Sequence, residues 1–219
     1  MNAVVYDLDN TLYDSKQYYL GAFDNVAEYI SSKYPFTRQH VFDLLRMNWE
    51  MHTSLYPHLF DDLQNCLGIT EDVNNLVTVF NGYGGKLTPY QGAVTTLQTL
   101  RKWNYKLGLI TDGDIERQKR KLKLLKIIDL FDAIVYTKQL SSPKPSDIPF
   151  RYMVAKLKIS PKISFYVADN PLVDFEGAKK TGFITIRVST GEFRNIKKNA
   201  YVDYEVQTLK EILSIVKNV

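Results

Sequence analysis

Short apolar runs recur along the chain, and most of them end in a polar or acidic residue. Runs of this kind that are rich in β-branched and aromatic residues are typical of strands buried on both faces, as in a parallel sheet. The sequence therefore predicts five strands and a candidate sixth: AVVYD at 3–7, KLGLITD at 106–112, AIVY at 133–136, ISFYVAD at 163–169, FITIRV at 183–188 and DYEV at 203–206.

Helical periodicity lies between the later strands. Residues 94–103, 117–125 and 148–159 each place apolar residues on one helix face. Gly182 stands before the FITIRV strand, where a glycine commonly ends a helix. This alternation of strands and helices predicts an α/β fold, with a doubly wound, Rossmann-like parallel sheet.

One long segment interrupts this alternation. It contains no strong strand, and its first part repeats apolar residues at the helical period, among them Tyr19, Phe23 and Ile30. A Gly- and Pro-containing linker, NGYGGKLTPYQG, leads back to the strands. We therefore predict an α/β core domain formed by residues 1–12 and 89–219, and a helical domain inserted between them at residues 13–88.

Composition and charge narrow the class of protein. The chain has 219 residues, of which 45% are hydrophobic and 24% charged, as in ordinary globular proteins. Its net charge of +4 suits an anionic small molecule but falls short of a nucleic-acid-binding pattern. With a single cysteine, no signal peptide and no apolar run long enough to span a bilayer, we expect a cytoplasmic protein without a membrane or nucleic-acid partner. The oligomeric state stays open.

Polar side chains gather where the predicted strands end. Because open parallel sheets bind ligands at the carboxyl ends of their strands, we expect these side chains to share one site. They come from four places in the chain: Asp7, Asp9 and Thr11 after the first strand, Thr111, Asp112 and Gly113 after the second, Lys144 in the loop SSPKPS, and Asp169, Asn170 and Asp174 after the strand at 163–169.

One chemistry uses all four groups. Mg²⁺ prefers oxygen ligands, typically one or two carboxylates with phosphate and water, and Asp7 and Asp169 can supply the carboxylates. A lysine, a hydroxyl and loop amides can hold the other phosphate oxygens. Aspartate also serves as a nucleophile toward phosphoryl groups.

These motifs resemble the haloacid dehalogenase (HAD) superfamily, in its phosphatase branch with a helical cap. DLDNT matches the family's DxDxT motif, and ADNPLVD is close to its GDxxxxD motif. Thr111 and Lys144 stand for the second and third motifs, in the same order along the chain. The gap between the first and second motifs has the size of a cap. The resemblance implies a Mg²⁺-dependent hydrolase with a cap inserted after the first strand.

The resemblance also implies roles around the metal. Asp7 would be the nucleophile and would bind Mg²⁺ together with Asp169. Asp9 would be the general acid and base, worth about 10²–10⁴-fold in rate, and its backbone carbonyl would also bind the metal. Thr11 would brace the turn, and Asn170 would assist the metal from a second layer.

Further roles concern the phosphate. Thr111 and the amides of Asp112 and Gly113 would bind the transferring phosphoryl group, with the next helix pointing its N-terminus at it. Lys144 would bind phosphate and offset the charge of Asp7. Asp174 would hold Lys144 or a metal-bound water.

Two residues depart from the family pattern. Ala168 stands where the family usually has glycine, and Asp112 stands where it often has asparagine. We expect the Asp112 side chain to turn away and cap the helix at 114–125. We expect the basic segment at 117–126 to be a solvated helix face, with Leu122 and Leu125 packing inward.

The sequence thus predicts a Mg²⁺-dependent phosphatase of a small soluble phosphomonoester, of the nucleotide or sugar phosphate class, working through an aspartyl-phosphate. Three alternatives remain. A phosphomutase usually has glycine where Asn10 stands, and a haloacid dehalogenase would lack the acid–base carboxylate of Asp9. A catalytically silent binding protein on this fold is the third, because fold does not fix function.

Overall fold

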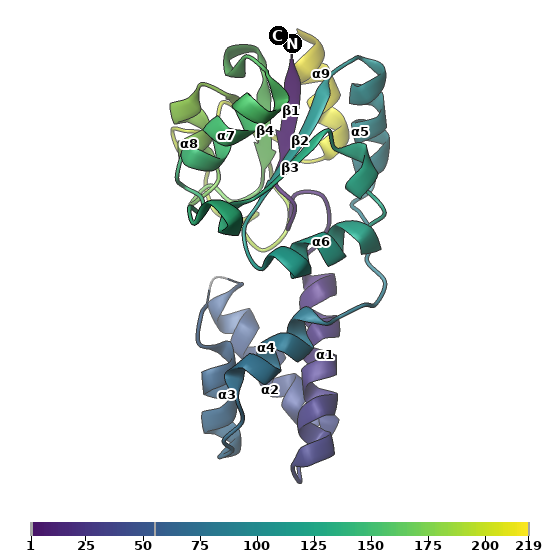
Figure 1. Cartoon of the computed structure of the whole chain (residues 1–219), viewed down its shortest axis with the longest axis vertical. Coiled ribbons are helices and arrows are strands. Elements are labelled where there is room, and N and C mark those ends of the chain that lie inside the picture. The colour runs from purple at the N-terminus through teal and green to yellow at the C-terminus, as the bar shows by residue number, and fades with distance from the viewer. Residues whose placement is uncertain (1, 55, 219) are drawn as a thin grey trace. The chain divides into compact units, whose positions relative to one another are not determined.

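The computed structural model describes residues 2–54 and 56–218, and it contains a six-stranded parallel sheet (Figure 1). The strand order is β3-β2-β1-β4-β5-β6, and every neighbouring pair is parallel. The predicted fold class is confirmed, and the candidate sixth strand is present. The strands are β1 (Ala3–Tyr6), β2 (Lys106–Thr111), β3 (Ala133–Tyr136), β4 (Phe165–Ala168), β5 (Ile184–Val188) and β6 (Tyr204–Val206).

The first strand lies at the centre of the sheet. Val5 pairs with Gly108 of β2 on one side and with Tyr166 of β4 on the other. All four residues of β1 are buried, because helices cover both faces of a parallel sheet. The loop that follows β1 is therefore placed between the loops that follow β2 and β4.

Helices cover the two faces of the sheet. α7 (Ile148–Leu157) and α8 (Phe175–Thr181) pack on one face, and α5 (Ala93–Lys102) and α9 (Ile212–Asn218) on the other (Figure 1). Between β2 and α7, Gly108 lets the backbones approach, since a Cβ there would come within 2.9 Å of the Met153 sulfur. The remaining helices of this part are α6 (Ile115–Leu124) and the short 3₁₀ turns η1 (Ile128–Leu130), η2 (Thr137–Leu140), η3 (Pro161–Ile163) and η4 (Leu209–Glu211).

The core under α7 and α8 is apolar and includes residues from the strands β1, β2, β3 and β4. Phe150, Met153 and Phe175 are fully buried there, against Val5 and Tyr166. Burying a side chain of this size is worth about 1.5–3 kcal/mol, so this layer fixes the strand ends and the loops that leave them.

The chain divides into two compact units, residues 1–15 with 86–219, and residues 16–85. Residues 13–15 and 86–88 therefore belong by their contacts to the α/β unit, where Tyr13 forms bridges with Asp9 and Pro89. The second unit is helical: α1 (Lys16–Lys33), α2 (Arg38–His52), α3 (Leu59–Leu67) and α4 (Val73–Asn81).

Aromatic rings fill the interior of the helical unit. Tyr19 stacks on Trp49 with ring centres 5.4 Å apart, and Phe23 lies 5.9 Å from Phe80. The Thr37 side chain accepts a hydrogen bond from the His40 amide and so marks the start of α2.

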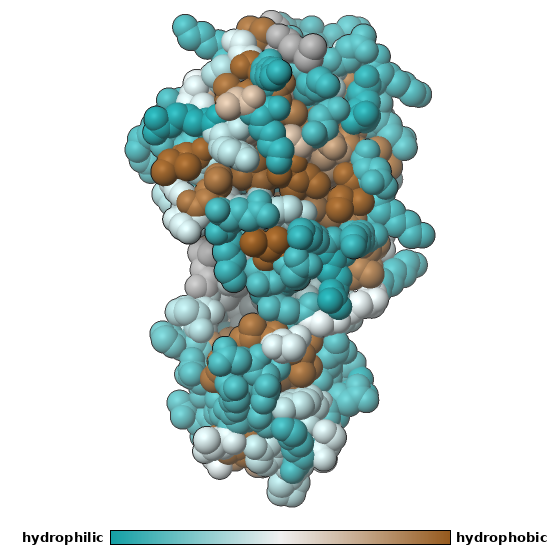
Figure 2. Space-filling model, viewed as in Figure 1, coloured by the Kyte–Doolittle hydropathy of each residue, from teal (hydrophilic) through white to brown (hydrophobic). Residues whose placement is uncertain are grey.

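The surface of the chain is mostly polar. In the view of Figure 2, hydrophilic residues dominate over α6 around a small apolar group, and a band of apolar residues crosses the α/β unit above this helix. Among the residues that the structure describes, no helix is both long enough and apolar enough for a membrane crossing.

Candidate active site

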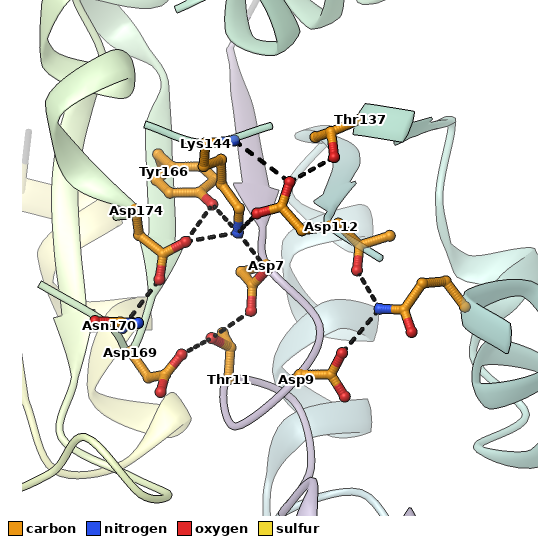
Figure 3. Close-up of polar contacts among 12 residues, drawn as sticks. Asp7, Asp9, Thr11, Asp112, Thr137, Lys144, Tyr166, Asp169, Asn170 and Asp174 are labelled. Atoms are coloured by element: carbon orange, nitrogen blue, oxygen red, sulfur yellow. Dashed lines mark hydrogen bonds and ion pairs between the residues drawn. The ribbon is translucent and has the colours of Figure 1, made fainter. Parts of the chain in front are cut away.

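The ends of β1, β2 and β4 and the loop after β3 bring the predicted site residues together (Figure 3). Asp7 follows β1 directly, and its amide donates to the Val167 carbonyl on β4 at 2.9 Å. Thr111 ends β2, and Asp169 follows β4. Asp7 and Asp169, 162 positions apart in the sequence, thus share one site, because parallel strands end at the same edge.

Lys144 lies at the centre of this cluster. Its Nζ is 2.6 Å from Asp7 Oδ1 and 2.6 Å from Asp174 Oδ1, and 3.7 Å from Asp112 Oδ2. Its side chain is only 3% exposed. Burial opposes the ammonium charge, but Asp174 and Asp7 outweigh burial and raise the pKa of Lys144. The lysine therefore stays charged and compensates the carboxylates around it.

Thr11 joins the two carboxylates expected to bind metal. Its Oγ1 lies 3.3 Å from Asp7 Oδ2 and 3.2 Å from Asp169 Oδ1. Burial, with the neighbouring Asp174 charge, raises the pKa of Asp169 well above its ordinary value. Burial is also the main cause that raises the pKa of Asp7 to about 7, and the Lys144 charge only partly offsets it.

These carboxylates suit a divalent cation. Asp169 Oδ2 is buried and has no hydrogen-bond partner among the described residues. Such an orphaned oxygen costs free energy unless a cation or water binds it. Within residues 2–54 and 56–218, no three His, Cys, Asp or Glu side chains form a ready metal cluster. The chain thus offers two side-chain oxygen ligands, and backbone, water and substrate would complete the shell, as Mg²⁺ allows.

The Asp9 side chain turns away from this pair, toward α6. Its Oδ1 accepts hydrogen bonds from Tyr13 Oη and Lys121 Nζ, both at 2.6 Å, and its Oδ2 accepts from Gln118 Nε2 at 2.8 Å. Burial opposes ionisation of this carboxylate, but the Lys121 charge and the hydrogen bonds outweigh burial and lower its pKa. Asp9 is therefore held as an anion, and of its oxygens only the backbone carbonyl stays a candidate metal ligand.

The sequence did not single out Gln118 and Lys121. Both are buried on α6, so the expectation of a wholly solvated helix face at 117–126 is wrong for them, while Leu122 and Leu125 do pack inward. The sequence pattern could have indicated that these two side chains are buried. Gln118 and Lys121 share the i, i+3, i+4, i+7 stripe with the two leucines, and a polar residue on an inward stripe needs a polar partner inside.

Asp112 does not cap the following helix. The N-cap of α6 is Asp114, whose side chain accepts from the Arg117 amide. Asp112 Oδ1 instead accepts from the Thr137 hydroxyl and from the Lys144 backbone amide. Its carboxylate thereby ties the loop after β3 to the end of β2, which explains an acidic residue at this position.

Asn170 and Asp174 organise the loop that follows β4. Asp174 accepts from Lys144 and, through Oδ2, from the Asn170 amide at 3.0 Å. It is the N-cap residue of α8 but makes no side-chain cap hydrogen bond, so the ion pair with Lys144 is its main contact. The Asn170 side chain accepts from the Leu172 amide and shapes its own turn.

Arg187 is a second supporting residue that the sequence did not reveal as such. It is 1% exposed on β5, and its Nε donates to the Asp169 carbonyl at 3.1 Å. The same guanidinium donates to the Phe193 carbonyl and pairs with Glu205. An arginine inside the apolar run FITIRV is the sequence feature that could have drawn attention to it.

Comparisons with known proteins agree with this geometry. The family model of haloacid dehalogenase-like hydrolases matches residues 4–188. The chain is 28% identical over 223 residues to a Methanocaldococcus jannaschii protein named glyceraldehyde 3-phosphate phosphatase, covering 100% of this chain and 98% of that protein. It is 24% identical over 230 residues to the pyrophosphatase PpaX of Bacillus mycoides, again covering 100% and 98%.

A solved structure has the same fold. The crystal structure of a HAD phosphatase from Thermococcus onnurineus superposes with a TM-score of 0.70 at 24% identity, covering 99% of this chain and 98% of that one. The family match spans Asp7, Thr111, Lys144 and Asp169. The chain therefore belongs to the haloacid dehalogenase-like hydrolase family and groups there with phosphoric monoester hydrolases.

Proposed function

We propose that this protein is a Mg²⁺-dependent phosphatase that hydrolyses a small phosphomonoester through an aspartyl-phosphate on Asp7. The observation that carries the proposal is the cluster around Lys144, whose ammonium lies 2.6 Å from both Asp7 and Asp174. A buried cation beside a buried carboxylate supports attack on an anionic phosphorus centre, because it reduces repulsion between nucleophile and substrate.

In the first half of the reaction, Asp7 attacks phosphorus and the substrate alcohol leaves. Lys144 and the Thr111 hydroxyl, with the amides of Asp112 and Gly113, hold the transferring phosphoryl oxygens. Asp9, carrying the proton that it took from water in the preceding turnover, gives this proton to the leaving alkoxide and returns to the ionised form. A divalent cation bound by Asp7 and Asp169 would supply charge neutralisation between the nucleophile and the phosphate.

In the second half, water hydrolyses the aspartyl-phosphate. The water loses a proton to Asp9, and the bond between Asp7 and phosphorus breaks to release phosphate. The contacts of Asp9 suit this half, because its carboxylate is held ionised by Lys121. A haloacid dehalogenase would not need this carboxylate, so the Asp9 network supports phosphate chemistry.

The substrate we propose is small. Relatives along the whole chain are named glyceraldehyde 3-phosphate phosphatase and pyrophosphatase PpaX, and both names denote small phosphate compounds. Within the predicted sugar and nucleotide phosphates, the first name favours a short sugar phosphate. We further propose that the inserted segment predicted at 13–88 acts as a cap that excludes water and selects the leaving group, in a cytoplasmic enzyme.

The test is phosphate release from a panel of sugar, nucleotide and small-acid phosphates and p-nitrophenyl phosphate, with Mg²⁺ and with EDTA. We expect metal-dependent turnover that Asp7→Asn abolishes. Absence of turnover across the panel would refute the phosphatase and favour a binding protein. Chloride release from a haloacid without metal would identify a dehalogenase, and interconversion of two sugar phosphates a mutase.

A further inference from the structure

Three donors converge on the Asp9 carboxylate, and two of them come from the same helix. Gln118 and Lys121 are one turn apart on α6, and each donates to a different oxygen of Asp9. Tyr13 provides the third donor from the chain segment that follows β1. Since both oxygens are bound, the carboxylate cannot rotate without breaking a hydrogen bond.

Gln118 also reaches the phosphate side of the site. Its Nε2 donates to Thr111 Oγ1 at 2.6 Å as well as to Asp9 Oδ2. Its Oε1 is buried and has no hydrogen-bond partner among the described residues. A buried unsatisfied acceptor costs free energy, so the fold tolerates a loss of stability to aim this amide nitrogen at both groups.

The burial of Lys121 also indicates that α6 holds the Asp9 carboxylate. Its side chain is 3% exposed, whereas Lys123 on the same helix is exposed, and the outer surface over α6 is largely hydrophilic (Figure 2). Lysine is rarely buried without a partner, because the desolvation of its charge is expensive. Asp9 is an anion in contact with Lys121, so this lysine joins α6 to the Asp9 carboxylate.

We propose that Gln118 and Lys121 are positioning residues that orient the Asp9 carboxylate for proton transfer and tie it to Thr111. This inference rests on the proposed phosphatase function. A proton donor must lie within hydrogen-bond reach of the leaving oxygen, and small misplacements are costly in rate. Releasing Asp9 from α6 should therefore slow steps that need its proton and leave phosphate binding nearly unchanged.

The leaving group separates positioning from a general structural effect. The phenolate of p-nitrophenyl phosphate leaves without much help from an acid, whereas the alkoxide of an alkyl phosphate such as glycerol phosphate needs a proton. The variants are Gln118→Met, which changes no charge, and Lys121→Met. Their matched controls are Gln139→Met and Lys123→Met at exposed positions. For each, kcat and KM are measured on both substrates, together with the urea midpoint.

For both variants we expect kcat/KM on the alkyl phosphate to fall about 10–10²-fold, within the total worth of acid–base assistance, with KM nearly unchanged. On p-nitrophenyl phosphate, kcat/KM of the same variants should stay within about 3-fold of the wild-type value. Lys121→Arg, which keeps the charge, should recover part of the loss. The controls should match wild type.

Two results would overturn the inference while the wild type remains active. Equal losses of kcat/KM on both substrates, a constant that reports only the steps up to the aspartyl-phosphate, would show a structural role only, and an unchanged kcat/KM on the alkyl phosphate would show that Asp9 is positioned without α6. A wild type inactive on both substrates would refute the proposed function itself, and the positioning role would fall with it. The wild-type rates thus tell the two failures apart.

Discussion

Replacing Asp7 by asparagine is expected to remove activity and, without metal, to stabilise the fold at alkaline pH. Asp7 is 6% exposed, and its neighbourhood contains the carboxylates of Asp169 and Asp174. Burial raises its pKa to about 7, against 3.8 for an exposed aspartate. Asparagine resembles the protonated form, so Asp7→Asn keeps the shape of the side chain and deletes its charge.

The direction and the size of this change in stability follow from proton linkage. Between about pH 4 and pH 7 the folded state binds the Asp7 proton more tightly than the unfolded chain, so stability falls as pH rises through this window. Above pH 7 the whole penalty is present, and it cannot exceed roughly 4 kcal/mol for this difference in pKa. The asparagine amide must find partners beside Lys144, so we expect a net gain of about 2 kcal/mol at pH 8 and almost none at pH 4.5.

Urea unfolding in EDTA at pH 4.5 and pH 8 measures this difference. With a slope of about 2–3 kcal/mol per molar urea, the midpoint of Asp7→Asn should lie about 1 M above wild type at pH 8. Mg²⁺ should stabilise wild type more than the variant, because binding of a cation to the folded state adds stability. The matched control is Asp129→Asn, at an exposed aspartate.

The reasoning would be refuted by a variant that is less stable than wild type at pH 8 in EDTA. A gain of the same size at both pH values would refute it equally, because a charge effect must vanish where the carboxyl is protonated. Retained phosphatase activity in Asp7→Asn would instead remove the residue from the role of nucleophile.

Three further predictions concern the supports of the site. Lys144→Met should abolish turnover and cost about 3–5 kcal/mol in urea unfolding at pH 8, because it leaves two buried carboxylates without their cation; a stability equal to wild type would contradict this. Gly177→Ala should lower kcat and stability by shifting the loop that carries Lys144, since a Cβ at Gly177 would lie 2.5 Å from one backbone carbonyl oxygen and 2.6 Å from another; crystal positions identical to wild type would disprove it. Arg187→Met should weaken Mg²⁺ binding, measured by calorimetry, because the Asp169 carbonyl loses its donor; unchanged affinity would show that Arg187 serves the fold alone.

The α/β sheet could be predicted from the sequence because its strands are buried on both faces and read as continuous apolar runs. The short β6, with only one of its three residues buried, could be predicted only as a candidate strand, because it lacks a continuous apolar run. The strand order cannot be derived from the apolar runs alone. It depends on β1 pairing with both β2 and β4, which is decided by packing between segments far apart in the chain.

The candidate site, too, could be predicted only in part from the sequence. Asp7, Lys144 and Asp169 could be predicted because their motifs are local and each follows a strand. Gln118 could not be assigned a partner, because its orientation depends on how α6 packs. Asp112 was given the wrong partner because a helix cap at Asp112 and one at Asp114 look equally good in sequence, and only the Thr137 hydroxyl and the Lys144 amide decide between them.

Two buried lysines separate the acidic residues of this site into groups with opposite proton affinities. Lys144 shares its charge among Asp7, Asp174 and Asp112, and burial still raises the pKa of Asp7 to about 7. Lys121 forms an ion pair with Asp9, and the pKa of Asp9 is lowered. Asp7 and Asp9, two residues apart, thus differ in the protonation state that the fold favours. Such a difference in pKa commonly accompanies different roles in catalysis. At neutral pH the Asp7 carboxyl needs a further cation to be fully ionised, whereas Asp9 is ionised already. The requirement for metal should therefore be strongest below pH 7 and should ease as pH rises.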